Sequence, residues 1–297
     1  MSSKSRLWAL VAEGDAPTGT IAAEVGQVAD LPRRSASFEA PAVRMNDLLQ
    51  EVEVLETRGR VGQVDVTDVT LDSREVGTGS LFCALVGSAH DGHEFAGEAA
   101  QRGAAALLVE RPLPVAVPQA IVAPGEARRA LAKIACALEG HPASSLTTLG
   151  VTGTNGKTST TQLLRKIFEA SGRPTQAIGT LSGSRTTPES PQLQRLLADA
   201  RDRGLEVVAM EVSSHALSQH RVDGFRFSAA VFTNLGHDHL DYHRTIESYF
   251  EAKASLFSRE HAELGVVNTD DPWGRRLMEI STIPMIGYSR RDVSEVE

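Results

Sequence analysis

The sequence predicts an α/β fold with two parts: a small N-terminal α/β domain, followed by a phosphate-loop domain with a mostly parallel sheet. Short apolar segments alternate with helical segments along the chain, as in α/β proteins. A glycine-rich loop at residues 150–158 lies between a predicted strand and a predicted helix. The later apolar segments are nearly continuous, which is typical of parallel strands covered on both faces.

The chain length and composition favour a soluble two-domain protein of the cytoplasm. The chain has 297 residues and a net charge of −8, which argues against nonspecific binding to nucleic acid or an anionic membrane. Cys83 and Cys136 lie in apolar or alanine-rich segments, so we expect buried thiols and no disulfide. No apolar run reaches membrane-spanning length, and the run at residues 7–12 is too short for a signal peptide.

The first domain is expected at residues 41–141, after a disordered extension at residues 1–40 that is rich in Ser, Ala, Gly and Pro. The patterns in this domain predict helices and strands in alternation. Helices are predicted to start at Met45–Leu49 and to run over 95–102 and 126–138, and strands over 64–69, 81–86 and 104–109. Gly140-His141-Pro142 is expected to form the hinge to the second domain.

The second domain is expected at residues 142–297. Its strands are predicted at 146–149, 207–212, 229–232 and 265–267. The helix after the glycine-rich loop is predicted at 159–171, where Leu163, Leu164, Ile167 and Phe168 share one face and Gly172 ends it. Ligands of parallel sheets bind at the carboxyl ends of the strands, so we expect the functional site there.

The loop reads Gly-Val-Thr-Gly-Thr-Asn-Gly-Lys-Thr, with Val151 where the generic phosphate-loop spacing requires glycine. Glycines let backbone N–H groups approach phosphate, and the helix N-terminus attracts anions. Lys157 can reach the terminal phosphates, and the Thr158 hydroxyl can hold Mg²⁺. A glycine-rich turn with a chance lysine is the alternative, but the flanking strand and helix favour nucleotide binding.

Candidate metal ligands follow two of the predicted strands. Glu211 ends an apolar strand and suits Mg²⁺, although a surface glutamate is the alternative. Residues 233–243 contain His-x-His and Asp-x-x-Asp spacings that invite a zinc interpretation. Mg²⁺ beside a triphosphate prefers oxygen ligands, so we expect one of these histidines to contact a metal and the others to serve structure.

Three further features depend on polar side chains. The segment 213–221 carries hydroxyls, an amide and Arg221, which suits either an anionic substrate or a solvated loop and helix start. Lys253 lies in an amphipathic helix, and its surroundings in the sequence predict an exposed side chain. Asn268 follows a strand, where its amide can bind a nucleotide base.

These residues carry a resemblance to the Mur ligases of bacterial cell-wall synthesis, which extends from about Met45 to the C-terminus. The motifs are Thr-Leu-Asp-Ser-Arg at 70–74, Gly-Thr-Asn-Gly-Lys-Thr at 153–158, Thr-Thr-Pro at 186–188, Glu-Val-Ser-Ser-His-Ala-Leu at 211–217 and Asp-His-Leu-Asp-Tyr-His at 238–243. The first and fourth separate this branch from the other Mur ligases and from folylpolyglutamate synthetases.

The resemblance implies an ATP-dependent ligase that adds the third stem-peptide amino acid to UDP-N-acetylmuramoyl-dipeptide through an acyl phosphate. This reaction belongs to peptidoglycan synthesis. Its implied cofactors are ATP and Mg²⁺, with a lysine carbamylated by CO₂ at Lys253. Its implied partners are the UDP-substrate and an amino acid, with meso-diaminopimelate and lysine both left open.

The resemblance also implies the roles of single residues. Those implied to bind ATP are Gly153, Thr154, Asn155, Gly156, Lys157, Thr158, Ser159 and Asn268. Those implied to bind the muramoyl-peptide substrate are Leu71, Ser73, Ser88, Ala89, His90, Thr186, Thr187, Ser213, Gln219 and Arg221. The implied metal ligands are Thr158, Glu211, His239 and carbamylated Lys253, and the implied catalytic residues are Lys157, Lys253 and His239.

Two departures from the family pattern affect this prediction. The segment 179–185 is shorter than is usual in the family, and Arg185 stands where asparagine is frequent. Family members continue beyond the position of Glu297, so we expect an incomplete central domain without the C-terminal ligase domain, which a separate chain would have to supply. The alternative function is a split ligase that binds nucleotide or UDP-muramoyl-peptide without turnover alone. The motif set argues against an unrelated phosphate-loop ATPase or kinase.

Overall fold

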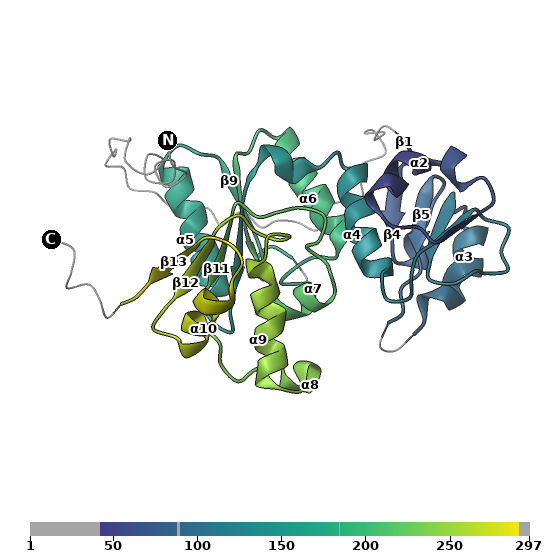
Figure 1. Cartoon of the computed structure of the whole chain (residues 1–297). Coiled ribbons are helices and arrows are strands. Elements are labelled where there is room, and N and C mark those ends of the chain that lie inside the picture. The colour runs from purple at the N-terminus through teal and green to yellow at the C-terminus, as the bar shows by residue number, and fades with distance from the viewer. Residues whose placement is uncertain (1–41, 88–89, 184, 291–297) are drawn as a thin grey trace.

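The computed structural model describes residues 42–87, 90–183 and 185–290 (Figure 1). The extension expected at residues 1–40 therefore lies outside the described residues. Within the described ranges, no helix has the length and apolar character needed to cross a membrane.

The N-terminal unit is built on a five-stranded sheet with the order β2-β7-β6-β5-β4, in which only β2 is antiparallel to its neighbour. A short antiparallel pair, β1–β3, lies beside it. The strands are β1 (Val43–Arg44), β2 (Glu56–Arg58), β3 (Asp65–Val66), β4 (Asp68–Thr70), β5 (Ser80–Cys83), β6 (Ala106–Val109) and β7 (Gln119–Ile121). The helices are α2 (Met45–Leu48), α3 (Ala96–Gln101) and α4 (Ala127–Leu138), with short 3₁₀ turns η1 (Leu49–Glu51), η2 (Val61–Gln63), η3 (Ser73–Glu75) and η4 (Gly92–Phe95).

Strand β5 shows how this sheet is covered on both faces. Successive side chains of a strand point to opposite faces, so Leu81 and Cys83 enter the core beneath α4 while Phe82 packs with Ala96 and Ala99 of α3. Every residue of β5 is buried, which explains its continuous apolar sequence. Both cysteines are free and buried, as predicted.

The second unit is built on a six-stranded parallel sheet with the order β13-β12-β11-β8-β10-β9. Its strands are β8 (Thr147–Thr152), β9 (Thr175–Ile178), β10 (Val207–Glu211), β11 (Ala229–Phe232), β12 (Gly265–Asn268) and β13 (Met285–Tyr288). Its helices are α5 (Lys157–Ala170), α6 (Ser190–Asp202), α7 (Ser214–Ser218), α8 (Leu240–His243), α9 (Ile246–Ala254) and α10 (Pro272–Ile280), with turns η5 (Pro142–Ser145) and η6 (Ser255–Phe257). The predicted fold class, a small α/β unit followed by a parallel-sheet unit, is therefore confirmed.

The two units meet where α4 packs against α6, which lie side by side in Figure 1. Polar contacts cross this boundary at several points. Arg129 Nε lies 3.3 Å from Asp223 Oδ2, and Arg195 Nη2 lies 2.5 Å from Asp68 Oδ1. Between α4 and η5 the chain turns sharply, with left-handed backbone at Gly140 (φ 69°) and His141 (φ 51°).

Two local differences from the predicted elements have physical causes. The strand expected at 64–69 is divided at Thr67, whose N–H donates to the Gly79 carbonyl and leaves β3 and β4 in different sheets. In α5, Leu164 and Phe168 pack against the core, whereas Leu163 and Ile167 are 59% and 57% exposed. The four residues predicted to share one face are thus split between core and surface.

Candidate active site around the phosphate loop

The glycine-rich loop joins the carboxyl end of β8 to the start of α5. Gly153 has φ 148° and Gly156 has φ 87°, values that residues with a Cβ rarely adopt. A Cβ on Gly153 would lie 1.9 Å from Thr233 Oγ1, so the neighbouring chain leaves no room for a side chain. Gly150, by contrast, lies inside β8 against the Phe227 ring, where an added Cβ would approach to 3.1 Å. Gly153 and Gly156 therefore shape the loop, and Gly150 allows close packing behind it.

The ends of the two next strands hold the loop in place. Thr154 N–H donates to the Asn234 carbonyl at 2.9 Å, and Asn155 N–H donates to Asn234 Oδ1 at 3.0 Å. Thr233 Oγ1 donates to the Asn155 carbonyl at 2.7 Å. Asn268 Nδ2 in turn donates to the Thr233 carbonyl at 3.0 Å. The Asn268 amide therefore braces the end of β11, where Thr233 and Asn234 in turn hold the loop.

Lys157 begins α5 and folds back over the loop. Its Nζ donates to the carbonyls of Gly153 at 2.9 Å and Thr154 at 3.0 Å. Burial lowers the pKa of Lys157, which Glu211 partly offsets. The first N–H groups of a helix have no partner within the helix, and those of α5 include Thr158 and the exposed Ser159. A lysine above a helix N-terminus makes this loop suited to anionic phosphate.

Glu211 lies at the carboxyl end of β10, directly beside the loop strand. The side chain is buried, and its Oε2 accepts from Thr158 Oγ1 at 3.0 Å. Its Oε1 accepts from Thr180 N–H at 2.8 Å. The alternative interpretation of Glu211 as a surface residue is therefore wrong, because the strand end is covered by the segment that begins at Gly179.

Lys253 is only 1% exposed, so the expectation of an exposed side chain is also wrong. Its Nζ donates to the Gly153 carbonyl at 3.0 Å and lies 4.5 Å from the centre of the Tyr249 ring. Burial lowers its pKa to about 7, and the nearby Lys157 acts in the same direction. Tyr249 also contacts the loop, with its hydroxyl 3.2 Å from Thr154 Oγ1. Helix α9 thus brings an amine of lowered pKa beneath the phosphate loop.

His239 lies on the exposed side of a histidine and tyrosine cluster. Its ring packs edge-on against His215, with centroids 4.9 Å apart, and lies 6.1 Å from the Tyr249 ring. His243 is buried, and its Nε2 is 2.9 Å from Ser214 Oγ. Across the described ranges, no three His, Cys, Asp or Glu side chains gather in a way that would bind a metal. The structure therefore brings Thr158 and Glu211 together, but no direct contact joins His239 to them.

The residues predicted to hold the muramoyl-peptide form a chain of contacts beside Glu211. Thr187 Oγ1 donates to the Glu211 carbonyl at 3.0 Å and accepts from Ser213 N–H at 3.0 Å. Arg221 Nη1 donates to the Thr187 carbonyl at 3.0 Å, and its Nη2 donates to Gln219 Oε1 at 2.6 Å. Thr186 reaches the same region, with its Oγ1 3.1 Å from Thr180 Oγ1. The interpretation of this segment as a solvated loop does not fit the burial of Arg221.

Two family descriptions match this chain. "Mur ligase middle domain" matches residues 151–295, which contain the phosphate loop, and "Mur ligase family, catalytic domain" matches residues 65–138. The chain belongs to the Mur ligase family.

Individual relatives agree with this assignment. The UDP-N-acetylmuramoyl-L-alanyl-D-glutamate–2,6-diaminopimelate ligase of Geobacter sulfurreducens is 43% identical over 262 residues, which cover 83% of this chain and 51% of the relative. A solved structure of a ligase with that name has a TM-score of 0.73 at 28% identity, covering 85% of this chain and 53% of the other. A MurF ligase from Thermotoga maritima, solved with ADP, has a TM-score of 0.50 at 24% identity, covering 75% of this chain and 50% of the other. This Mur ligase chain thus spans about half the length of the curated relatives it matches.

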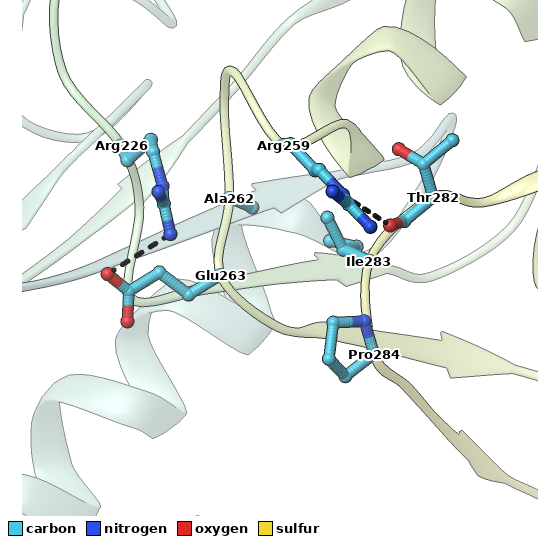
Figure 2. Close-up of a pocket in the computed structure, with 7 residues that line it drawn as sticks. All are labelled: Arg226, Arg259, Ala262, Glu263, Thr282, Ile283 and Pro284. Atoms are coloured by element: carbon cyan, nitrogen blue, oxygen red, sulfur yellow. Dashed lines mark hydrogen bonds and ion pairs between the residues drawn. The ribbon is translucent and has the colours of Figure 1, made fainter.

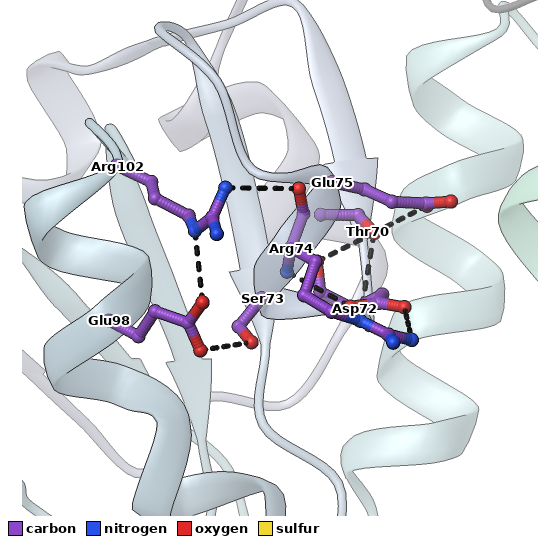
Figure 3. A network of polar contacts seen from close by, with 7 residues as sticks. All are labelled: Thr70, Asp72, Ser73, Arg74, Glu75, Glu98 and Arg102. Carbon is purple, nitrogen blue, oxygen red and sulfur yellow. Dashed lines mark hydrogen bonds and ion pairs between the residues drawn. The ribbon is translucent and has the colours of Figure 1, made fainter.

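A second group of predicted substrate residues lies on the N-terminal unit of this Mur ligase (Figure 3). Ser73 is buried in η3, and its Oγ donates to Glu98 Oε2 at 2.8 Å. Asp72 caps η3, and the neighbouring Arg74 guanidinium, its closest cation at 2.6 Å, lowers the pKa of that carboxyl. Leu71 packs half-buried against the core of this unit.

His90 belongs to the same predicted group and is exposed, with its ring 6.3 Å from Phe95. Ser88 and Ala89 lie outside the described residues. The structure therefore separates the predicted substrate contacts into two groups on different units, one around Ser73 and one around Arg221.

Sequence reasoning missed several residues that shape the Mur ligase site. Thr180, Tyr249 and Glu189 each contact a predicted site residue. Nothing in the local sequence pattern distinguishes Thr180 or Tyr249. Glu189 directly follows the Thr-Thr-Pro motif, which is the signal that would have found it.

A cavity of about 300 Å³ lies at the amino ends of the strands, away from the phosphate loop (Figure 2). Its lining residues are Arg226, Arg259, Ala262, Glu263, Thr282, Ile283 and Pro284. Its two arginines are already engaged, Arg226 with Glu263 at 3.4 Å and Arg259 Nε with the Thr282 carbonyl at 3.3 Å. None of the predicted site residues lines this cavity.

Proposed function

We propose that this chain carries the UDP-substrate and ATP sites of a ligase that adds the third amino acid to UDP-N-acetylmuramoyl-dipeptide. The observation that carries the proposal is the convergence of Thr158, Glu211 and Lys253 on the phosphate loop. A loop of this kind beside a buried carboxylate suits phosphoryl transfer, in which positioning and charge neutralisation supply most of the catalysis.

The substrate class is inferred from the motifs and from the activities of the relatives. Their names specify a UDP-N-acetylmuramoyl-L-alanyl-D-glutamate acceptor and 2,6-diaminopimelate as the amino acid added. We extend both to this chain. Of the two amino acids that the sequence left open, these names favour diaminopimelate over lysine. ATP and a UDP-linked sugar are water-soluble, so we also propose that the chain acts in the cytoplasm.

ATP is proposed to bind with its phosphates over the loop 153–159. Lys157, whose amine contacts the loop carbonyls, is available to turn toward the terminal phosphates. The Asn268 amide is hydrogen-bonded to backbone groups of Thr233 and Asp270 in the structure. We therefore propose that Asn268 acts on nucleotide binding indirectly, by holding Thr233 in place.

Mg²⁺ fits the donor set at Thr158 and Glu211. A hydroxyl and a carboxylate 3.0 Å apart at the end of the loop are hard oxygen donors, and phosphate oxygens complete such sites in other nucleotide-binding proteins. His239 is proposed as a further ligand that approaches from the histidine cluster. When bound, Mg²⁺ would neutralise charge on the transferred phosphoryl group.

Lys253 is proposed to be carbamylated. Its amine is buried beside Lys157, and its pKa is lowered to about 7, so a neutral amine is available at physiological pH. A neutral amine adds to CO₂ with loss of one proton and becomes a carbamate anion. The exchange of a cation for an anion removes the repulsion from Lys157 and supplies an oxygen ligand beside the loop.

The proposed reaction begins when the substrate carboxylate attacks the γ-phosphorus of ATP and ADP leaves, which gives an acyl phosphate. The amine of the amino acid then attacks the acyl carbon, loses a proton and expels phosphate. In this chain, Arg221 and Thr187 are proposed to orient the muramoyl-peptide, while Lys157 neutralises the phosphates. The Ser73 group on the first unit is proposed to hold the uridine end.

The test is to incubate this chain with UDP-muramoyl-dipeptide, ATP and Mg²⁺ and to measure phosphate release with and without diaminopimelate or lysine. Equilibrium binding of ATP and of the UDP-substrate is measured in parallel. We expect both ligands to bind. A chain that binds neither ligand would contradict the proposal, and binding without turnover would favour the split-ligase alternative.

A further inference from the structure

Glu189 pairs with three guanidinium groups that come from separate parts of the chain. It lies at the start of α6, with Arg221 Nη2 2.9 Å and Arg128 Nη1 3.6 Å from its carboxylate oxygens. Arg185, in the preceding loop, is its third partner. Arg128 belongs to α4 of the first unit, so this carboxylate also joins the two units.

The group carries an excess of positive charge. One carboxylate faces three arginines, which leaves a formal charge of about +2 among them. Arg221 is 9% exposed, and burial lowers its pKa. Glu189 raises the pKa of Arg221, whereas Arg185 and Arg128 lower it, so the three cations lie close enough to repel each other. Arg221 is buried, whereas the Arg128 and Arg185 side chains are 27% and 54% exposed. An excess of positive charge around a buried arginine favours the binding of an anion.

Two buried atoms of this group lack hydrogen-bond partners in the structure, Arg221 Nε and Glu189 Oε2. Buried polar atoms are normally paired, so an unpaired guanidinium donor is free to take a further acceptor. A carboxylate binds arginine side-on through two N–H groups, commonly Nε and one Nη. Here Glu189 and Gln219 both use Nη2, and Nε has no partner.

The same arginine reaches the phosphate site through its other nitrogen. Arg221 Nη1 donates to the Thr187 carbonyl, and Thr187 Oγ1 donates to the Glu211 carbonyl. An anion bound at Arg221 therefore lies two hydrogen bonds from the strand end that carries Glu211.

We propose that Glu189 is a positioning residue that stands in for a carboxylate of the substrate. It pairs with Arg221 in the free protein, and the muramoyl-peptide carboxylate takes over that guanidinium on binding. Arg128 and Arg185 then neutralise Glu189, so binding tightens the contact between the two units. This inference rests on the proposed function, in which Arg221 holds the muramoyl-peptide.

If Glu189 stands in for the substrate carboxylate, Glu189→Gln should lower the stability of the free protein and raise its affinity for the substrate. In Glu189→Gln, the free protein keeps Arg221 buried without a charged partner, so its Tm falls. The substrate carboxylate no longer competes with Glu189 and meets a more positive site, so it binds more tightly. A residue with a structural role alone would lower the Tm and weaken or leave unchanged the binding.

The experiment measures, by calorimetry on the full chain, the affinity for UDP-muramoyl-dipeptide and for UDP-N-acetylglucosamine, which has the phosphates but no carboxylate. We expect Glu189→Gln to bind the dipeptide substrate about threefold or more tightly, and Arg128→Gln and Arg185→Gln to bind it more weakly. Arg195→Gln is the matched control, because it removes an arginine paired across the same boundary, with Asp68, away from Glu189. Affinity for UDP-N-acetylglucosamine should be unchanged in all four variants.

Weaker or unchanged dipeptide binding by Glu189→Gln would overturn the inference, as would an equal gain for UDP-N-acetylglucosamine. If Glu189→Gln does not fold, the other variants decide, since unchanged affinity in Arg128→Gln and Arg185→Gln also overturns it. Wild-type chain that binds ATP but no UDP-muramoyl-dipeptide would instead refute the proposed function, which is a distinguishable result.

Discussion

The phosphate-loop region and the Ser73 region both place charged side chains near predicted ligands, but they differ in solvent exposure. Lys253 and Glu211 are 1% and 2% exposed, and each is held by a named backbone or hydroxyl contact. In the Asp72–Arg74 pair, the arginine side chain is 77% exposed. Water screens the Asp72–Arg74 pair but not the buried contacts of Lys253 and Glu211. Removing a buried group should therefore change stability or activity more than removing an exposed one.

The largest effect is expected at Lys253. Lys253→Ala removes the amine beneath the loop, and we expect at least about a 100-fold loss of substrate-dependent phosphate release. Short carboxylates such as acetate should restore part of the activity, because they replace the proposed carbamate. Lys166→Ala, on the exposed side of α5, is the control and should keep wild-type activity. Full activity in Lys253→Ala would remove the reason for treating the buried region as the catalytic one.

The next effect is expected at Gly153. Gly153→Ala must place a Cβ against Thr233 Oγ1 at φ 148°, and we expect loss of ATP binding and about 1–3 kcal/mol of stability. Gly172→Ala is the matched control. It has φ 81° but open space around the added Cβ, so it should cost about 1 kcal/mol and leave ATP binding intact. ATP titration and denaturant unfolding measure the two effects, and equal losses in both variants would show that crowding at the loop is unimportant.

The pH dependence of stability sharpens the comparison further. Burial lowers the pKa of Lys253 from 10.5 to about 7 in the folded chain, so the folded state disfavours its charged form. Below about pH 7 the amine is charged in both states, and the free-energy cost of burying the charge is fully present. Above the folded pKa the folded state no longer carries the charge, so the free energy of unfolding rises between about pH 7 and 10. Lys253→Met should lack this rise when both proteins are unfolded with urea in CO₂-free buffer. Parallel curves for the two proteins would contradict the burial argument.

The smallest effect is expected at the exposed pair. Arg74→Ala should leave the Tm unchanged within error, because surface ion pairs contribute little to stability. Ser73→Ala is the contrasting variant, since it removes a buried hydroxyl that donates to Glu98 and should lower the Tm measurably. Thermal unfolding at low and high salt checks both. A large Tm loss in Arg74→Ala would remove the distinction between the two regions.

Much of the fold could be predicted because its information is local. Segments such as 229–232, with a continuous apolar sequence, coincide with strand β11, and the strand–loop–helix order around Lys157 identified the phosphate loop. Lys253 could not be placed from its neighbours. Its burial depends on the loop carbonyl of Gly153, one hundred residues earlier in the chain. The family resemblance singled it out, whereas helical periodicity did not.

The Arg221 region shows the same limit. The polar segment 213–221 predicted an anion site, but the carboxylate that pairs with its arginine lies more than thirty residues away in sequence. Gly150 is a related case. Its spacing suggested part of the phosphate loop, whereas the structure shows that it makes room for the Phe227 ring. Tertiary packing decides such roles, and the packing of distant segments cannot be inferred from the local pattern of a single sequence.

The register of the central strands limits how this protein can vary in length. In the strand register, Glu211 lies beside Val151 and Phe232 lies beside Thr152. The phosphate loop, the Glu211 carboxylate and Thr233 therefore all leave the sheet at the same level. One residue inserted within β10 would turn Glu211 to the opposite face, whereas a residue added at the surface turn before β10 would not. Tolerated insertions and deletions should therefore collect at the amino ends of these strands, which makes that edge the place to attach a tag or a fused domain.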